Sequence, residues 1–126
     1  MKPTVCVDLD GVLAHWDGSF DPVEFGPMIL GADIFTHELS KKFRVLIHTA
    51  RISQEVAHPH SLGFVKQHVI DWLTNNSIAF DDVWEGKGKP VAVMYVDDRA
   101  HSCRPQYDGA DAFKHILQKA DEEAEK

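Results

Sequence analysis

Two aspartates, Asp8 and Asp10, follow an apolar run in the stretch Asp8-Leu9-Asp10-Gly11-Val12. The preceding residues 4–7 are β-branched or small and apolar, which predicts a buried strand. On a straight strand both carboxylates point to one face, where they repel each other unless a cation lies between them or one is protonated. Mg²⁺ prefers carboxylate oxygens together with water and substrate phosphate, so this spacing favours a magnesium site. The pattern also occurs in turns and calcium loops, but no further acidic residues follow here at calcium-loop spacing.

Two further apolar runs end in polar residues. Residues 43–49 end at Thr49, which is followed by Ala50 and Arg51. Residues 91–96 are followed directly by the pair Asp97-Asp98. A glycine-rich loop over 86–90 precedes the last of these runs and contains the lysines Lys87 and Lys89.

The spacing of apolar residues predicts the elements that position these side chains. Strands are expected over 3–9, 43–49, 78–84 and 91–96, and helices over 31–42, over 61–75 and around 110–117. Residues 11–27 and 50–60 are expected to be loops. This alternation predicts an α/β fold: a single three-layer Rossmann-like domain with a mainly parallel sheet. Ligands bind beyond the carboxyl ends of such strands, which brings the polar residues named above to one edge.

Composition limits the classes of partner. The 126 residues are enough for one domain, which we place at 1–120, with 121–126 as an acidic tail that frays into solvent. The net charge of −7, without a basic run, argues against a long nucleic acid as partner. No segment has the apolar length of a membrane span, and Cys6 and Cys103 fit reduced thiols, so we expect a cytoplasmic protein. The sequence leaves the oligomeric state open.

Taken in order, these segments resemble the four motifs of the haloacid dehalogenase (HAD) superfamily of phosphohydrolases. The stretch from Asp8 to Val12 is similar to the first motif, and the strand that ends in Thr49 is similar to the second. Lys87 or Lys89 corresponds to the third motif, and Tyr95-Val96-Asp97-Asp98-Arg99 to the fourth. The first and fourth motifs are the specific ones, because many strands end in Thr and many loops contain Lys.

The resemblance implies a role for each residue. Asp8 would be the nucleophile that forms an aspartyl-phosphate, and Asp10 the general acid and base. Lys89 or Lys87 would neutralise the phosphoryl group; we favour Lys89, which directly precedes Pro90. Substrate contacts would come from Thr49, Ala50 and Arg51, although Arg51 could equally be an ion-pair partner. Mg²⁺ would be held by the carboxylates of Asp8 and Asp97, by the backbone carbonyl of Asp10 and by Asp98, directly or through water; of the adjacent pair we favour Asp97.

The resemblance therefore implies a magnesium-dependent phosphatase that hydrolyses a small phosphomonoester, either a sugar phosphate or a nucleotide. The segments between the motifs leave no room for a folded cap, so we expect an open site. His15, Trp16, Asp17 and Phe20 of the first loop could contact the leaving group or pack locally. His48 is expected in the core. The alternatives are a phosphatase acting on nucleic-acid ends and a non-catalytic binding domain that retains a HAD-like fold.

Overall fold

A computed structural model describes residues 1–19, 21–100 and 102–125 of the chain. Its strands are β1 (Thr4–Val7), β2 (Arg44–Ile47), β3 (Asp82–Val83) and β4 (Met94–Val96). Its helices are α1 (Ala32–Ser40), α2 (Gln54–Ala57), α3 (Leu62–Asn75), α4 (Pro105–Asp108) and α5 (Asp111–Ala124). The order of strands and long helices is the one that the sequence predicts.

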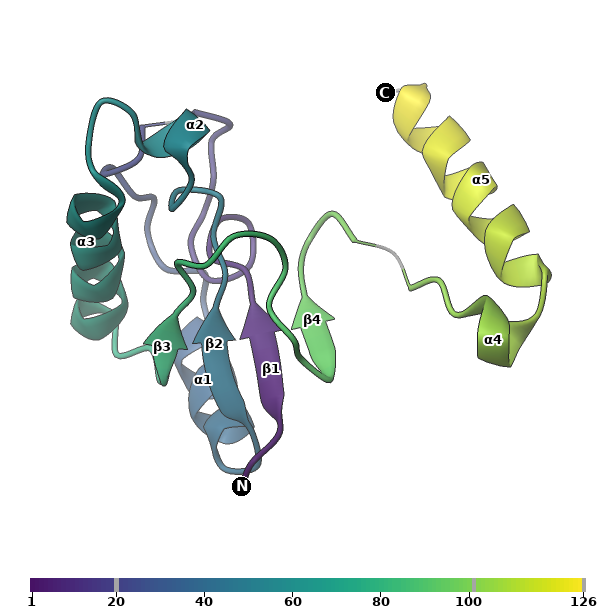
Figure 1. The fold of residues 1–126 in the computed structure, drawn as a ribbon, viewed down its shortest axis with the longest axis horizontal. Coiled ribbons are helices and arrows are strands. Elements are labelled where there is room, and N and C mark those ends of the chain that lie inside the picture. Colours follow the sequence, from purple (N-terminus) through teal and green to yellow (C-terminus); the bar gives the residue numbers. More distant parts are fainter. Residues whose placement is uncertain (20, 101, 126) are drawn as a thin grey trace.

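The described strands form a four-stranded sheet in the order β3-β2-β1-β4, and every neighbouring pair is parallel (Figure 1). In this register Cys6 of β1 lies between Leu46 of β2 and Tyr95 of β4. The carboxyl ends of all four strands therefore lie at one edge. This arrangement confirms the predicted α/β class with a Rossmann-like parallel sheet.

The main hydrophobic cluster lies on one face of the sheet. Val5 and Val7 of β1 are fully buried there together with Val45 and Ile47 of β2. The apolar stripe of α3 and Ala32 of α1 pack against these strands; the buried members of the stripe are Val65, Val69 and Leu73. Ser61 caps α3, since its hydroxyl accepts a hydrogen bond of 3.1 Å from the backbone N–H of Phe64. Burial of this stripe fixes α3 beside the strands and so fixes the edge where they end.

Several predicted boundaries differ in the structure, and two of these differences can be traced to single side chains. The expected loop over 50–60 contains the short helix α2, which begins after Ser53 because its hydroxyl accepts a hydrogen bond from the N–H of Val56. The strand expected over 78–84 is reduced to β3. The backbone N–H of Val45 donates to the carboxylate of Asp81 at 2.7 Å. This side chain therefore replaces a backbone hydrogen bond between β2 and the residues before β3, and the paired strand begins only at Asp82.

The C-terminal helix differs from its prediction in length and position. We expected the acidic residues from 121 onward to fray, but α5 continues to Ala124, and Lys119 pairs with Glu122 at 3.3 Å one turn along. Its neighbour is α4, and Figure 1 shows α5 standing apart from the sheet. No residue of α5 is buried. Across the described chain, no helix is both long and apolar enough to cross a membrane.

Candidate active site

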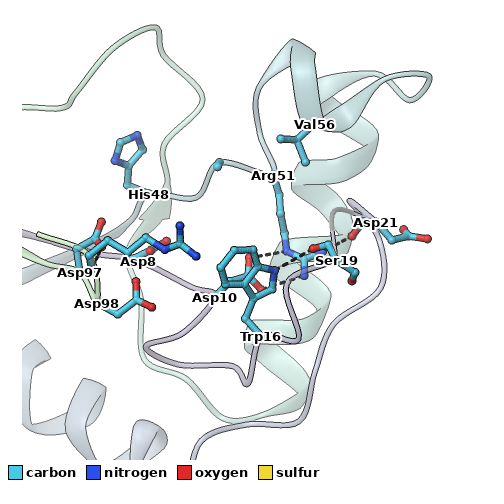
Figure 2. Close-up of a pocket in the computed structure, with 12 residues that line it drawn as sticks. Asp8, Asp10, Trp16, Ser19, Asp21, His48, Arg51, Val56, Asp97 and Asp98 are labelled. Atoms are coloured by element: carbon cyan, nitrogen blue, oxygen red, sulfur yellow. Dashed lines mark hydrogen bonds and ion pairs between the residues drawn. The ribbon is translucent and has the colours of Figure 1, made fainter. Parts of the chain in front are cut away.

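A cavity of about 370 Å³ opens at the carboxyl edge of the sheet. Most of the predicted site residues line it, namely Asp8, Asp10, Ala50, Arg51, Asp97 and Asp98. They come from three strand ends that are far apart in sequence, and Figure 2 shows the labelled ones, Asp8, Asp10, Arg51, Asp97 and Asp98, around one space. The parallel register explains this convergence, because β2 and β4 both pair with β1.

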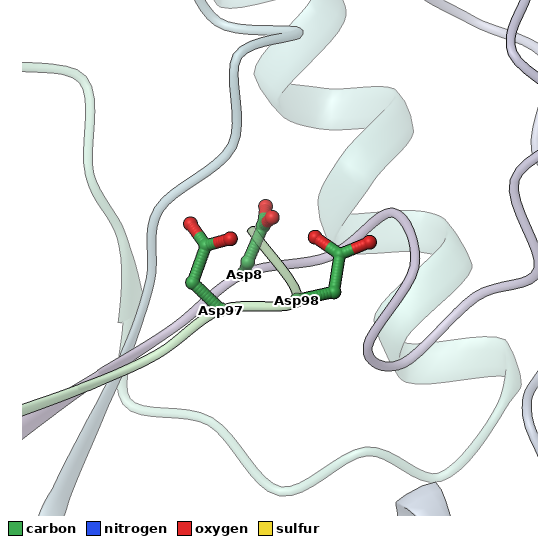
Figure 3. A group of neighbouring side chains, drawn as sticks. All are labelled: Asp8, Asp97 and Asp98. Atoms are coloured by element: carbon green, nitrogen blue, oxygen red, sulfur yellow. The ribbon is translucent and has the colours of Figure 1, made fainter. Parts of the chain in front are cut away.

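Three carboxylates at this edge form a compact acidic group. Asp8, Asp97 and Asp98 each offer an oxygen, and these oxygens lie within 4.8 Å of one another (Figure 3). The backbone N–H of Asp8 donates to the carbonyl of Val96 at 2.9 Å, which ties the end of β1 to the end of β4. We expected one of the adjacent pair Asp97 and Asp98 to dominate, because side chains alternate along a strand. Both reach the group because β4 ends at Val96 and the chain bends there.

Gly11 lets Asp98 approach the first strand end. Its φ of +85° lies in the left-handed region, which favours glycine. A Cβ atom at this position would lie 2.2 Å from Oδ2 of Asp98, closer than any real contact. The glycine that follows the two aspartates is therefore required both for the turn and for the position of a third carboxylate.

The electrostatics of Asp8 fit a cation at this site. Burial raises the pKa of Asp8 to about 7, and the charges of Asp97, Asp10 and Asp98 contribute to the rise. The backbone N–H of Leu9, 2.8 Å from Oδ1 of Asp8, acts in the opposite direction. A hard divalent cation would offset this crowded negative charge, and three carboxylate oxygens are the donor set that Mg²⁺ prefers. The residues present therefore fit the predicted ion.

Asp10 faces away from this group and binds Arg51. Nε of Arg51 donates to Oδ2 of Asp10 at 2.8 Å, and Nη2 donates to Oδ1 at 2.9 Å (Figure 2). Arg51 is itself 6% exposed. Its Nη1 donates to the backbone carbonyl of Asp21 at 2.8 Å, and its guanidinium lies 4.1 Å from the ring centre of Phe25. Arg51 thus connects Asp10 to the loop that follows β1, which is the ion-pair role that the sequence left open.

The threonine predicted to bind a phosphoryl oxygen lies at the end of β2. Thr49 is 3% exposed, and its Oγ1 accepts a hydrogen bond of 3.2 Å from the backbone N–H of Arg51. The neighbouring Ala50 is exposed and lines the cavity. Of the turn 49–51, Ala50 and Arg51 line the cavity, whereas the buried Thr49 is not among its lining residues, so the contact of Thr49 with a phosphoryl oxygen stays a prediction.

The predicted lysines lie outside the cavity. Nζ of Lys89 is 3.8 Å from the ring centre of Tyr95, and Lys87 is exposed. Within the described residues neither lysine forms an ion pair with Asp8. The role of Lys89 in neutralising a phosphoryl group therefore stays a prediction, and in this structure its ammonium group packs on an aromatic ring.

Two further residues line the cavity, and the sequence predicted a different place for one of them. His48, expected in the core, is only half-buried and lines the cavity; burial lowers its pKa, against the opposing effect of Asp97. Arg99 lies 4.5 Å from the ring centre of Trp16, so the fourth motif and the first loop meet across the cavity. The aromatic residues of the first loop are the sequence feature from which this wall of the cavity could have been predicted. Phe20, from the same predicted set, lies outside the described residues.

Comparison with solved structures supports the fold. A conserved protein from Bacteroides thetaiotaomicron is similar over 94% of this chain and 93% of its own, with 21% identity and a TM-score of 0.55. A structural-genomics target from Vibrio cholerae is similar over 98% of this chain and 99% of its own, with 26% identity and a TM-score of 0.50. The D,D-heptose 1,7-bisphosphate phosphatase of B. bronchiseptica, solved with magnesium and phosphate, has 17% identity and a TM-score of 0.44 over 96% of this chain and 64% of its own. This third likeness is too remote to carry an argument about function.

No family model and no curated protein matches the sequence. The function must therefore be argued from the residues of the site.

Proposed function

We propose that this chain is a magnesium-dependent phosphatase of the HAD type that hydrolyses a small phosphomonoester through an aspartyl-phosphate on Asp8. One observation supports this most strongly. Asp8, Asp97 and Asp98 place three carboxylate oxygens within 4.8 Å of one another at the edge where a phosphoryl group would enter. A structural cluster of this kind, without a ligand to hold, would cost stability through charge repulsion.

The first half of the proposed reaction uses Asp8 and Asp10. A carboxylate oxygen of Asp8 attacks phosphorus in line, a P–O bond forms to Asp8, and the P–O bond to the leaving group breaks. Asp10 donates a proton to the departing oxygen, which leaves as an alcohol. Both oxygens of Asp10 accept hydrogen bonds from Arg51 in this structure, so this step requires one of those contacts to open.

The second half regenerates the enzyme. Asp10, now ionised, takes a proton from water as the water oxygen attacks phosphorus, and the bond from phosphorus to Asp8 breaks. Asp8, Asp97 and Asp98 would hold Mg²⁺, which when bound supplies positive charge to the phosphoryl oxygens. Thr49 would donate a hydrogen bond to one of these oxygens, and Lys89 would reach the same group by leaving the ring of Tyr95.

The cavity fits a small substrate. Its volume of about 370 Å³ lies at the small end of the range for ligand sites. The described connections between the strands contain no folded cap, as predicted, and Trp16 with Arg99 forms one wall. A sugar phosphate or a nucleoside monophosphate fits this description, with the phosphate at the acidic edge.

A panel of phosphorylated sugars and nucleotides tests the proposal through the release of inorganic phosphate. We expect at least one substrate to be hydrolysed with Mg²⁺ and none after chelation. Asp8→Asn should abolish release, because an amide cannot attack as an anion. Asp71→Asn is the matched control, since Asp71 is exposed on α3 and pairs there with Gln67. Turnover in Asp8→Asn equal to that of the control would refute the proposed nucleophile.

A further inference from the structure

The C-terminal helix carries an apolar stripe that the described residues cover only in part. Phe113, Ile116, Leu117 and Ala120 recur at helical spacing along α5 and form one face. The side chains of Phe113 and Leu117 are 55% and 66% exposed. A helix of this length is marginal by itself in water, and its stability normally comes from packing such a face.

A second apolar surface lies on the strand that leads to α5. Val91 is 94% exposed and Val93 is 67% exposed, and β4 is an edge strand. The N–H of Val93 donates to the carbonyl of Thr4 at 2.9 Å, so Val93 continues the register of β4 and lies by alternation on the face of Tyr95. This is the face opposite to the core that α1 and α3 cover. We call Val91, Val93 and Tyr95 the β4 patch.

The chain does not bring these two surfaces together. α4 packs against α5, and the two helices form an arm that extends away from the sheet beyond β4 (Figure 1). Among the described residues, each molecule therefore presents the exposed stripe of α5 and the exposed β4 patch as two separate apolar surfaces. A second copy offers the same two surfaces. In a dimer with two-fold symmetry, the helix of each copy can cover the strand patch of the other, so both helix faces and both strand patches are covered and the assembly closes at two copies.

We propose that the protein is a homodimer in which α5 of each copy docks on the β4 patch of the other. The size of the contact agrees with this. α5 has 14 residues and is about 21 Å long. Docking one such helix buries on the order of 500 Å² of total surface, so the two exchanged helices reach roughly 1,000 Å², near the lower limit for a specific dimer.

The charges at the two surfaces are complementary. α5 carries four acidic residues and two lysines, with Asp121, Glu122 and Glu123 together near its end. The β4 patch follows Lys87 and Lys89, and the ammonium group of Lys89 lies on the ring of Tyr95. An acidic helix end therefore meets a basic rim, which helps to orient the helix on the strand.

Light scattering coupled to gel filtration tests the assembly. We expect twice the chain mass of 14.2 kDa for the wild type and a shift to a single chain mass for Leu117→Glu. Gln118→Glu, on the side of the same helix that faces away from the stripe, is the matched control and should remain dimeric. A monomeric wild type, or a dimer that survives Leu117→Glu, would overturn the proposal. Because α5 lies outside the core, the fold of Leu117→Glu can be checked by cooperative thermal unfolding.

A designed disulfide identifies the two surfaces. Val93→Cys and Leu117→Cys are combined with Cys103→Ser, which removes the exposed native thiol, while the buried Cys6 is kept. We expect oxidation to give a covalent dimer on a non-reducing gel, and Val93→Cys with Gln118→Cys, whose side chain faces away from the stripe, to give much less. A monomer with an internal disulfide would mean that α5 docks on its own strand, and no cross-link would mean that it docks elsewhere. Either result contradicts the proposal.

Discussion

At the scale of residues, the sequence left two roles open for Arg51, a substrate contact or an ion pair. The structure pairs Arg51 with Asp10. The types and spacing of Asp8, Asp10, Asp97 and Asp98 predicted an acidic site, because parallel strands bring their ends to one edge. The partner of Arg51 depends on where the loop after β1 folds back. That path is fixed by contacts such as the one from Arg51 to the carbonyl of Asp21, which no local pattern encodes.

The geometry makes Arg51 a positioning residue for Asp10. Arg51→Lys keeps the charge but loses the two parallel hydrogen bonds, so Asp10 should be less well placed to donate a proton. We expect kcat to fall by about 10²-fold on an alkyl phosphate, whose leaving group needs that proton, and by less on a nitrophenyl phosphate. Added guanidinium should partly restore the rate in Arg51→Ala.

The control for this experiment is Arg104→Lys, because Arg104 is exposed and pairs only loosely with Asp108. If Arg51 instead binds the substrate directly, KM should rise for both substrates and kcat should change equally for them. That pattern would contradict the proposal that Arg51 acts by positioning Asp10.

The raised pKa of Asp8 predicts how magnesium and pH act together. Without metal the folded chain holds a proton on Asp8 more tightly than the unfolded chain does, so stability decreases as pH rises from the ordinary value of 3.8 through about 7. Mg²⁺ requires the ionised carboxylate. The increase in Tm on adding Mg²⁺ should therefore be larger at about pH 8 than at about pH 6. An equal increase at both pH values, measured by calorimetry, would mean that Asp8 does not contact the ion.

At the scale of elements, the turn after β1 controls the shape of the acidic group. Gly11→Ala should weaken Mg²⁺ binding by about 10–100-fold, because the new Cβ would displace Asp98. Gly18→Ala is the matched control: Gly18 also has a positive φ, of 91°, but a Cβ there meets nothing within 4 Å. Both variants carry the same backbone strain, so titration calorimetry with Mg²⁺ isolates the effect on Asp98. Equal affinities in the two variants would exclude this role of Gly11.

Elements with a long periodic pattern were predicted well, and those set by single contacts were not. The stripe of Val65, Val69 and Leu73 and the cap at Ser61 locate α3 within about a residue. The length of β3 depends on the side chain of Asp81 binding the backbone of β2. Interactions of this kind join residues far apart in sequence, so periodicity contains no signal for them.

At the scale of the whole molecule, alternating strands and helices predicted a parallel α/β domain, which the sheet order β3-β2-β1-β4 confirms. The place of β4 beside β1 follows from packing rather than from local sequence, since the chain must return past two strands to reach it. The position of α5 also could not be predicted from the sequence. Its periodicity predicts an apolar face but does not identify the surface that covers it.

The central claim is a covalent phosphoryl intermediate on Asp8, and trapping it is the most direct measurement. In Asp10→Asn the second half of the reaction should slow, because no base remains to activate water. After rapid mixing with a nitrophenyl phosphate and Mg²⁺, followed by an acid quench, peptide mass spectrometry should find one phosphoryl group on Asp8. Asp10→Asn with Asp8→Asn should remain unmodified. Turnover of Asp10→Asn at the wild-type rate, or a phosphoryl group on a residue other than Asp8, would contradict the account.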